Sequence, residues 1–103
     1  MKVLIVCSMG MSSEVAVNSL KKAAEENGAD MYVQAVGSSD FEDELERESY
    51  DVAVVAPQIR HRYKDLKAIA DAKGVPCEVI DAKGYSPIGG KFLYKQVMSI
   101  VEK

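Results

Sequence analysis

The sequence predicts an α/β protein in which a parallel four-stranded sheet lies between two layers of helices. Short β-branched apolar runs alternate along the 103 residues with longer segments whose apolar residues recur at helical spacing. We expect the four strands at residues 3–7, 31–36, 52–56 and 77–80. Because these runs are apolar at nearly every position, both faces of the sheet need helices over them. The expected architecture is therefore a three-layer α/β/α sandwich.

The first two helices are predicted from an apolar stripe and from capping residues. The first spans residues 12–27, carries Leu20 on its apolar face and stops at Gly28. The second opens at Ser39, and Glu42 follows at the spacing of a capping box. An acidic run from Asp40 to Glu48 occupies this helix, and we expect it to be a solvated surface.

The third and fourth helices are bounded by proline and glycine. The third starts after Pro57, places Leu66 on its apolar side and ends at Gly74. The fourth follows the pair Gly89-Gly90 and runs to the C-terminus with Leu93 facing inward. The element order is thus strand and helix in strict alternation, four times.

Right-handed crossovers between parallel strands limit the possible topologies. For a unit of this kind we expect strand order 2-1-3-4, a flavodoxin-like topology. Ligands of such sheets bind beyond the carboxyl ends of the strands, at the switch point between the first and third strands. Cys7 and the turn at residues 57–60 should therefore face each other across one site.

Composition narrows the class of protein further. With 103 residues, 48% hydrophobic, the chain is expected to form a single domain spanning residues 1–103. Lys plus Arg number 13 against 16 Asp plus Glu, so a nucleic-acid partner is not expected. The apolar runs fall well short of the roughly 20 residues that span a bilayer, which predicts no direct membrane insertion. The two cysteines lie on separate predicted strands, as is typical of reduced thiols in a cytoplasmic protein.

The segment with the clearest chemical signature follows the first strand. Cys7 is followed by Ser8, Met9, Gly10, Met11, Ser12 and Ser13, and then directly by a helical pattern. Free N–H groups of the loop and of the first helical turn would converge on the sulfur there. Such a place favours a thiolate, or a phosphate carried on it. The plain alternative is a buried strand-end cysteine without chemistry.

Two other functions are compatible with part of this pattern. A low-molecular-weight thiol phosphatase or arsenate-reductase-like enzyme has Arg after Cys and five further residues, to clamp the phosphate. Counting from Cys7, this chain has Ser13 or Glu14 at that place, which argues against hydrolysis. A flavodoxin-like module that binds FMN is disfavoured because the first loop lacks a Thr-rich phosphate cradle and Tyr85 is the only aromatic residue expected in a site loop.

Several segments together resemble a known family. Residues 6–13 read Val-Cys-x-x-Gly-Met-Ser-Ser, residues 50–52 Tyr-Asp-Val and residues 56–60 Ala-Pro-Gln-Ile-Arg, and an Ile-Asp pair precedes Tyr85. This pattern is similar to the IIB components (EIIB) of the phosphoenolpyruvate-dependent sugar phosphotransferase system, of the lactose, cellobiose and chitobiose class. The fold that this resemblance implies is like that of low-molecular-weight tyrosine phosphatases. Met9 departs from the family pattern, since many members carry a small residue there.

The resemblance implies a phosphotransferase that relays phosphate. Cys7 would form a phosphocysteine, and residues Ser8 to Ser13 would bind the phosphate. The donor would be a phosphohistidine on the partner protein EIIA, and the acceptor a sugar held by the membrane transporter EIIC. The protein would act in the cytoplasm and be recruited to the inner face of the membrane through EIIC. Neither a cofactor nor a metal is expected.

Three residues outside the loop are candidates for the edge of the site. Gln58 and Arg60 are placed to reach phosphate or a partner, and the alternative is a solvated helix start. Tyr85 is expected to cover the site, contact a partner or simply pack. His61, the only histidine, is expected to be an exposed bystander. A secondary hypothesis makes Arg60 and Arg62 a docking patch for an acidic partner.

Overall fold

Four parallel strands form the centre of the molecule, and the fold class predicted from the sequence is confirmed. The computed structural model describes residues 1–7, 10–85 and 88–101, and of residues 10–13 the backbone alone. The sheet has the order β2-β1-β3-β4, with each neighbouring pair parallel. Its strands are β1 (Lys2–Cys7), β2 (Tyr32–Gly37), β3 (Val52–Val55) and β4 (Cys77–Val79).

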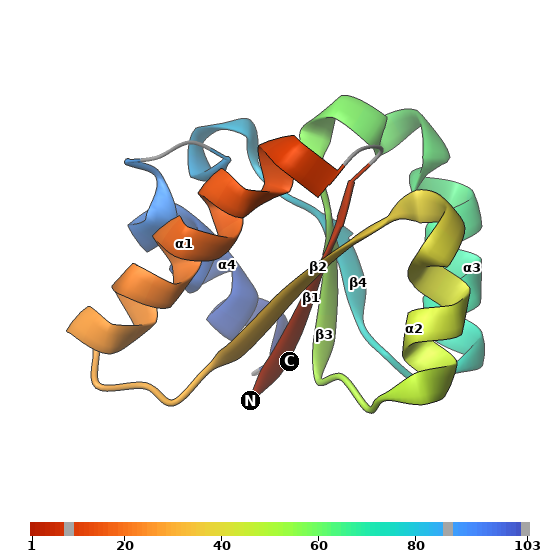
Figure 1. Ribbon diagram of the computed structural model, residues 1–103, viewed down its shortest axis with the longest axis horizontal. Helices are drawn as coiled ribbons and strands as arrows, with labels where there is room; N and C mark the ends of the chain where they lie inside the picture. The colour runs from red at the N-terminus through yellow and green to blue at the C-terminus, as the bar shows by residue number, and fades with distance from the viewer. Residues whose placement is uncertain (8–9, 86–87, 102–103) are drawn as a thin grey trace.

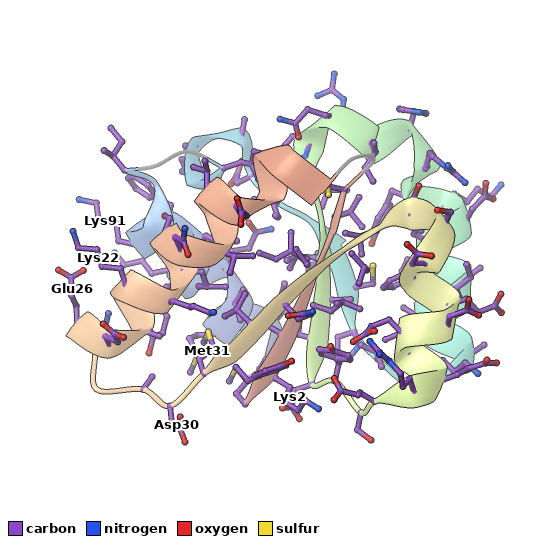
Figure 2. All side chains as sticks on the ribbon, viewed as in Figure 1. Lys2, Lys22, Glu26, Asp30, Met31 and Lys91 are labelled. Atoms are coloured by element: carbon purple, nitrogen blue, oxygen red, sulfur yellow. The ribbon has the colours of Figure 1, made fainter. Side chains whose placement is uncertain are left out.

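Helices cover both faces of this sheet. Figure 1 shows α1 and α4 on one side, and α2 and α3 on the other. The outer faces of the helices carry charge, as Lys22, Glu26 and Lys91 illustrate (Figure 2). The helices are α1 (Gly10–Glu26), α2 (Phe41–Arg47), α3 (Tyr63–Ala72) and α4 (Gly90–Val101), with 3-10 turns η1 (Ser38–Asp40), η2 (Pro57–Arg62) and η3 (Ala82–Gly84).

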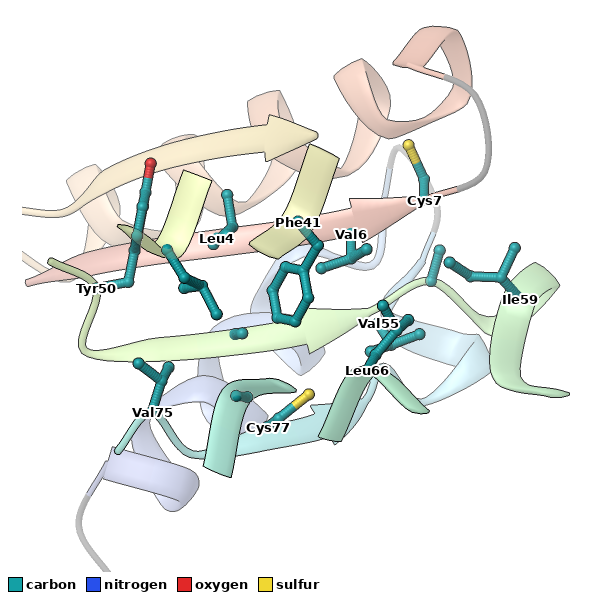
Figure 3. Close-up of a cluster of buried hydrophobic side chains, with 14 residues drawn as sticks. Leu4, Val6, Cys7, Phe41, Tyr50, Val55, Ile59, Leu66, Val75 and Cys77 are labelled. Carbon is teal, nitrogen blue, oxygen red and sulfur yellow. The ribbon is translucent and has the colours of Figure 1, made fainter. Parts of the chain in front are cut away.

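Alternation along the strands divides the core into two clusters, one on each face of the sheet. Leu4 and Val6 of β1 belong to the cluster beneath α2 and α3, which Figure 3 shows around Phe41. Val3 and Ile5 belong to the cluster beneath α1 and α4. These four side chains of β1 are fully buried. Burying one large aliphatic side chain stabilises the fold by about 1.5–3 kcal/mol, so the central strand is firmly anchored.

The ends of the helices differ in part from the sequence prediction. The first helix begins at Gly10 rather than at residue 12. The predicted capping box of Ser39 and Glu42 is wrong, because Ser39 already lies inside η1 and Asp40 precedes α2 without a side-chain cap. A cap requires an extended backbone at the residue that leads into the helix, and the 3-10 turn removes that geometry from Ser39.

Two glycines end helices as predicted. Gly28 after α1 and Gly74 after α3 have φ of 67° and 72°, the left-handed region in which a side chain is strained. The third helix starts later than expected, because Pro57 opens the 3-10 turn η2, which is kinked at Ile59 before α3 begins. Across the described ranges of the chain, no helix is long and apolar enough to cross a membrane.

Candidate active site

Cys7 is the last residue of β1 and lies at the carboxyl edge of the sheet. It is buried, with 2% of its surface exposed, and its Sγ–H donates to the carbonyl of Val36 at an S···O distance of 3.7 Å. Figure 3 shows the sulfur at the tip of β1, beyond Val6. Helix α1 begins at Gly10, so only two residues separate the cysteine from the helix. This confirms the prediction that the thiol lies where the first strand ends and the first helix begins.

The remaining residues of the predicted loop are only partly covered by the structure. Ser8 and Met9 lie outside the described residues. The backbone of Gly10, Met11, Ser12 and Ser13 forms the first turn of α1. N–H groups in the first turn of a helix have no acceptor within the helix, and the helix dipole is positive at this end. The turn carries no acidic residue, so its field is well suited to an anion.

The predicted meeting of the first and third strands is also observed. The N–H of Ala56 donates to the Val6 carbonyl at 2.8 Å, which brings the start of η2 beside the end of β1. Ile59 of η2 is 3% exposed and packs in the same cluster as Cys7 (Figure 3). The turn at residues 57–60 and the cysteine therefore share one edge of the sheet.

Basic side chains line this edge on η2. Arg60, His61 and Arg62 close the turn, and all three are exposed, as is Gln58. Arg62 reaches across to η1, where its Nη1 donates to the hydroxyl of Ser38 at 3.1 Å. His61 is exposed as predicted. The bridge between Arg62 and Ser38 was not predicted, because the sequence does not reveal that η1 and η2 are neighbours.

Tyr85 follows η3 on the same edge, as expected from the sequence. Its ring is partly buried and packs against both core clusters. The hydroxyl end is fully buried and has no hydrogen-bond partner among the residues that the structure describes. The sequence predicted that Tyr85 lies on this edge but gave no sign of this unpartnered hydroxyl.

The acidic run on α2 contains a buried member, which corrects the expectation of a uniformly solvated surface. Glu44 is 5% exposed, accepts a hydrogen bond from the Tyr50 hydroxyl at 2.5 Å and is paired with Arg47. The Tyr50 hydrogen bond is the main cause that lowers the pKa of Glu44 below its ordinary value, against the effect of burial. This group stabilises α2 and its surroundings.

The second cysteine, Cys77, lies at the start of a strand, away from the edge where Cys7 lies. Cys77 on β4 is 4% exposed, and burial raises the pKa of its thiol to about 11. Its carbonyl accepts a hydrogen bond from Tyr63 at 2.9 Å. Within the described part of the chain, no three His, Cys, Asp or Glu side chains cluster in a way that would hold a metal ion.

The fold and the site define a class: a doubly wound α/β domain with a cysteine at the switch point of its sheet. Comparison with known families makes this specific. Residues 2–94 match the family described as the lactose/cellobiose-specific IIB subunit of the PTS system, the sugar phosphotransferase system. The chain belongs to this family, and the resemblance found in its sequence motifs is confirmed.

Individual relatives support the same assignment. The oligo-beta-mannoside-specific EIIB component of Bacillus subtilis is 30% identical over 97% of this chain and 95% of its own length. The lactose-specific EIICB component of Streptococcus mutans is 38% identical over 71% of this chain, which spans only 12% of that protein. The solved lactose-specific IIB domain of Streptococcus pneumoniae covers 97% of this chain and 96% of its own, with TM-score 0.80 and 21% identity, and so shows the same fold.

Proposed function

We propose that Cys7 is the phosphoryl carrier of this IIB component. The observation that carries the proposal is the position of the cysteine: it ends the central strand and is separated by two residues from the N-terminus of a 17-residue helix. The N–H groups and the dipole of that helix stabilise negative charge on the sulfur and on a phosphoryl group attached to it. Residues Ser8 to Ser13 supply this phosphate-binding loop, and the whole chain, 1–103, acts as one domain.

The reaction has two phosphoryl transfers through the same sulfur. In the first, the Cys7 thiolate attacks the phosphorus of a phosphohistidine on EIIA, and the S–P bond forms as the P–N bond breaks. The electron pair of the broken bond stays on the imidazole nitrogen, which takes up the proton given up by the thiol. In the second, a sugar hydroxyl attacks the phosphorus, the S–P bond breaks toward sulfur, and the hydroxyl proton passes to solvent.

A carrier must resist attack by water between these two steps. Thiol phosphatases clamp the phosphate with an Arg that follows the cysteine by six positions, and that guanidinium stabilises the transition state of hydrolysis. This chain has Ser13 at that position. Backbone N–H groups hold the phosphoryl group without that cation, which favours storage over hydrolysis.

The partners follow from the family and from its fused members. The Streptococcus mutans relative is an EIICB protein, in which the matching segment is joined to an EIIC part. We infer that the present chain passes its phosphate to a sugar bound by a membrane EIIC and receives it from EIIA. It acts in the cytoplasm and is recruited to the inner face of the membrane by EIIC. Gln58, Arg60 and Tyr85 lie at the edge that these partners must approach.

The experiment combines a phosphoenolpyruvate relay that ends in EIIA with intact mass spectrometry and peptide mapping. The wild-type chain should gain the mass of one phosphoryl group, located on Cys7. Cys7→Ser should stay unlabelled, whereas the matched variant Cys77→Ala, which alters the other buried cysteine, should label like the wild type. A wild-type chain that is not labelled, or a label that persists in Cys7→Ser, would overturn the proposal. Turnover of p-nitrophenyl phosphate would favour a phosphatase instead.

A further inference from the structure

Tyr85 occupies an unusual position relative to the two halves of the core. The sheet separates the two clusters, yet the Tyr85 ring packs against both. A side chain can do this only at a border of the sheet, and η3 places Tyr85 just after the edge strand β4, at the carboxyl edge. Figure 1 shows η3, η2 and the start of α1 gathered at this same edge. Tyr85 therefore spans the edge where Cys7 lies.

The Tyr85 hydroxyl differs from the hydroxyls of two other tyrosines that pack in the core. Tyr50 donates to Glu44, and Tyr63 donates to the carbonyl of Cys77. The Tyr85 hydroxyl is buried without a partner among the described residues. Burial of a hydroxyl without a hydrogen bond is unfavourable, and folded proteins rarely leave such a group unsatisfied. We therefore infer that this hydroxyl finds its acceptor on a ligand.

The geometry of the sheet brings that acceptor within reach. Strands β1 and β4 both flank β3, so their ends lie two strand spacings apart, roughly 10 Å. Tyr85 packs against the cluster that contains Cys7. The Cys7 thiol of the free chain is hydrogen-bonded to Val36 on β2, and a phosphoryl group on the sulfur would extend from β1 beyond the carboxyl edge that Tyr85 shares. It would carry strong acceptor oxygens with negative charge.

We propose that the Tyr85 hydroxyl donates a hydrogen bond to the phosphoryl group carried on Cys7, a role that rests on the phosphocysteine function proposed above. The hydroxyl stays unpaired in the unphosphorylated chain and finds its acceptor when the phosphate arrives. Phosphorylation then relieves an unfavourable burial and gains a charge-assisted hydrogen bond. Tyr85 thereby stabilises the loaded form of the carrier relative to the empty one.

The first test compares Tyr85→Phe with Tyr63→Phe. Both variants keep an aromatic ring and lose a hydroxyl, but the Tyr63 hydroxyl is bonded to the Cys77 carbonyl on β4. We expect Tyr85→Phe to lower the equilibrium ratio of phosphorylated to free Cys7, at fixed donor, by about 10- to 100-fold. Tyr63→Phe should leave this ratio unchanged and lower the melting temperature of the free chain. The melting temperature of free Tyr85→Phe should not fall, because no hydrogen bond is lost.

The second test reads the phosphoryl group directly by ³¹P NMR during a pH titration. Donation from Tyr85 favours the more highly charged form, so the phosphoryl pKa should be higher in Tyr85→Phe than in the wild type and in Tyr63→Phe. Equal ratios and equal titrations in all three proteins would overturn the role of Tyr85 while the carrier function stands. If Tyr85→Phe does not fold, ¹⁹F NMR of the wild-type chain containing fluorotyrosine tests the same contact. Its Tyr85 ¹⁹F resonance must then shift on phosphorylation, and an unmoved resonance would refute the contact. A wild-type chain that takes no phosphate on Cys7 refutes the carrier function itself.

Discussion

At the scale of single residues, burial distinguishes side chains that look alike in the sequence. Glu44 is one of several acids in a row, yet it alone of the described acids is buried, between Tyr50 and Arg47. The helical pattern does place position 44 beside the inward-facing Leu45, but an acidic run gave no reason to expect a buried carboxylate. The signal available in the sequence was Tyr50, a hydroxyl donor just before the next strand.

Glu44 predicts a loss of stability in acid. Its pKa is lowered in the folded chain from an ordinary value of 4.5, so the unfolded chain takes up the proton first as the pH falls. The stabilisation from Glu44 is fully present above the ordinary pKa of the unfolded chain. It disappears as the pH drops through the lower pKa of the folded chain. Urea unfolding of the wild type should therefore show a free energy that declines below about pH 4.5, and Glu44→Gln should show a shallower decline. Equal slopes in both proteins would contradict this role.

Cys77 predicts an unreactive thiol. The reactive species is the thiolate, and the raised pKa of about 11 together with 4% exposure keeps this thiol protonated and shielded. In Cys7→Ser, iodoacetamide at about pH 8 should leave the remaining cysteine unmodified in the folded chain and label it after unfolding in urea. The extent of labelling is measured by intact mass. Rapid labelling without urea would show that β4 opens readily.

At the scale of elements, the strands were predicted within one or two residues, and the largest difference lies at the start of α3, which begins at Tyr63 rather than directly after Pro57. Apolar β-branched runs determine strands directly, because each residue of a central strand is buried on one face or the other. Helix starts depend on turns whose geometry comes from tertiary contacts. Pro57 and Ser38 both begin 3-10 turns, and the contact between Arg62 and Ser38 links those turns across the sheet edge.

The packing of α1 on α4 depends on a glycine. A Cβ added to Gly90, the first residue of α4, would lie 2.3 Å from the backbone oxygen of Ser19 in α1. Neither backbone can move aside cheaply, so Gly90→Ala should lower the free energy of unfolding by about 1–3 kcal/mol, although Ala favours helices. Lys91→Ala at the next, exposed position should change it by less than about 0.5 kcal/mol. Urea midpoints measure both, and an unaffected Gly90→Ala would show that the two helices are free to separate.

At the scale of the whole molecule, charge is unevenly distributed. The chain has a net charge of −3, yet the two positive charges of Arg60 and Arg62 lie close together at the edge where Cys7 lies. Oppositely charged surfaces accelerate the encounter of partners, and salt screens this effect. The hypothesis that Arg60 and Arg62 dock an acidic partner is thus compatible with their exposure on η2.

Reversal of both charges tests this docking surface. The variant Arg60→Glu with Arg62→Glu should slow phosphoryl transfer from EIIA by about tenfold at low salt, and the difference should shrink as salt is added. Lys21→Glu with Lys22→Glu makes the same change in net charge on exposed positions far along α1. The rate of Cys7 labelling in rapid-quench experiments distinguishes the two. Equal rates in the two double variants would exclude a specific docking role.

The candidate site was predictable as far as topology alone defines it. Cys7 and the turn at residues 57–60 follow from strand order, because carboxyl ends of parallel strands meet at one edge. The unpartnered hydroxyl of Tyr85 and the contact between Cys7 and the Val36 carbonyl depend on side-chain directions at loop ends. No periodicity in a single sequence encodes those directions.

The burial of the cysteine has a kinetic consequence. Cys7 is 2% exposed, so under the proposed carrier function the phosphate donor and the sugar-loaded acceptor have to reach its sulfur in alternation. The overall reaction should then follow a double-displacement scheme, with parallel lines in double-reciprocal plots when EIIA and acceptor concentrations are varied. Intersecting lines would require both partners to be bound together. Saturating amounts of unphosphorylated EIIA should likewise inhibit delivery to the acceptor, because it occupies the same edge without bringing a phosphate.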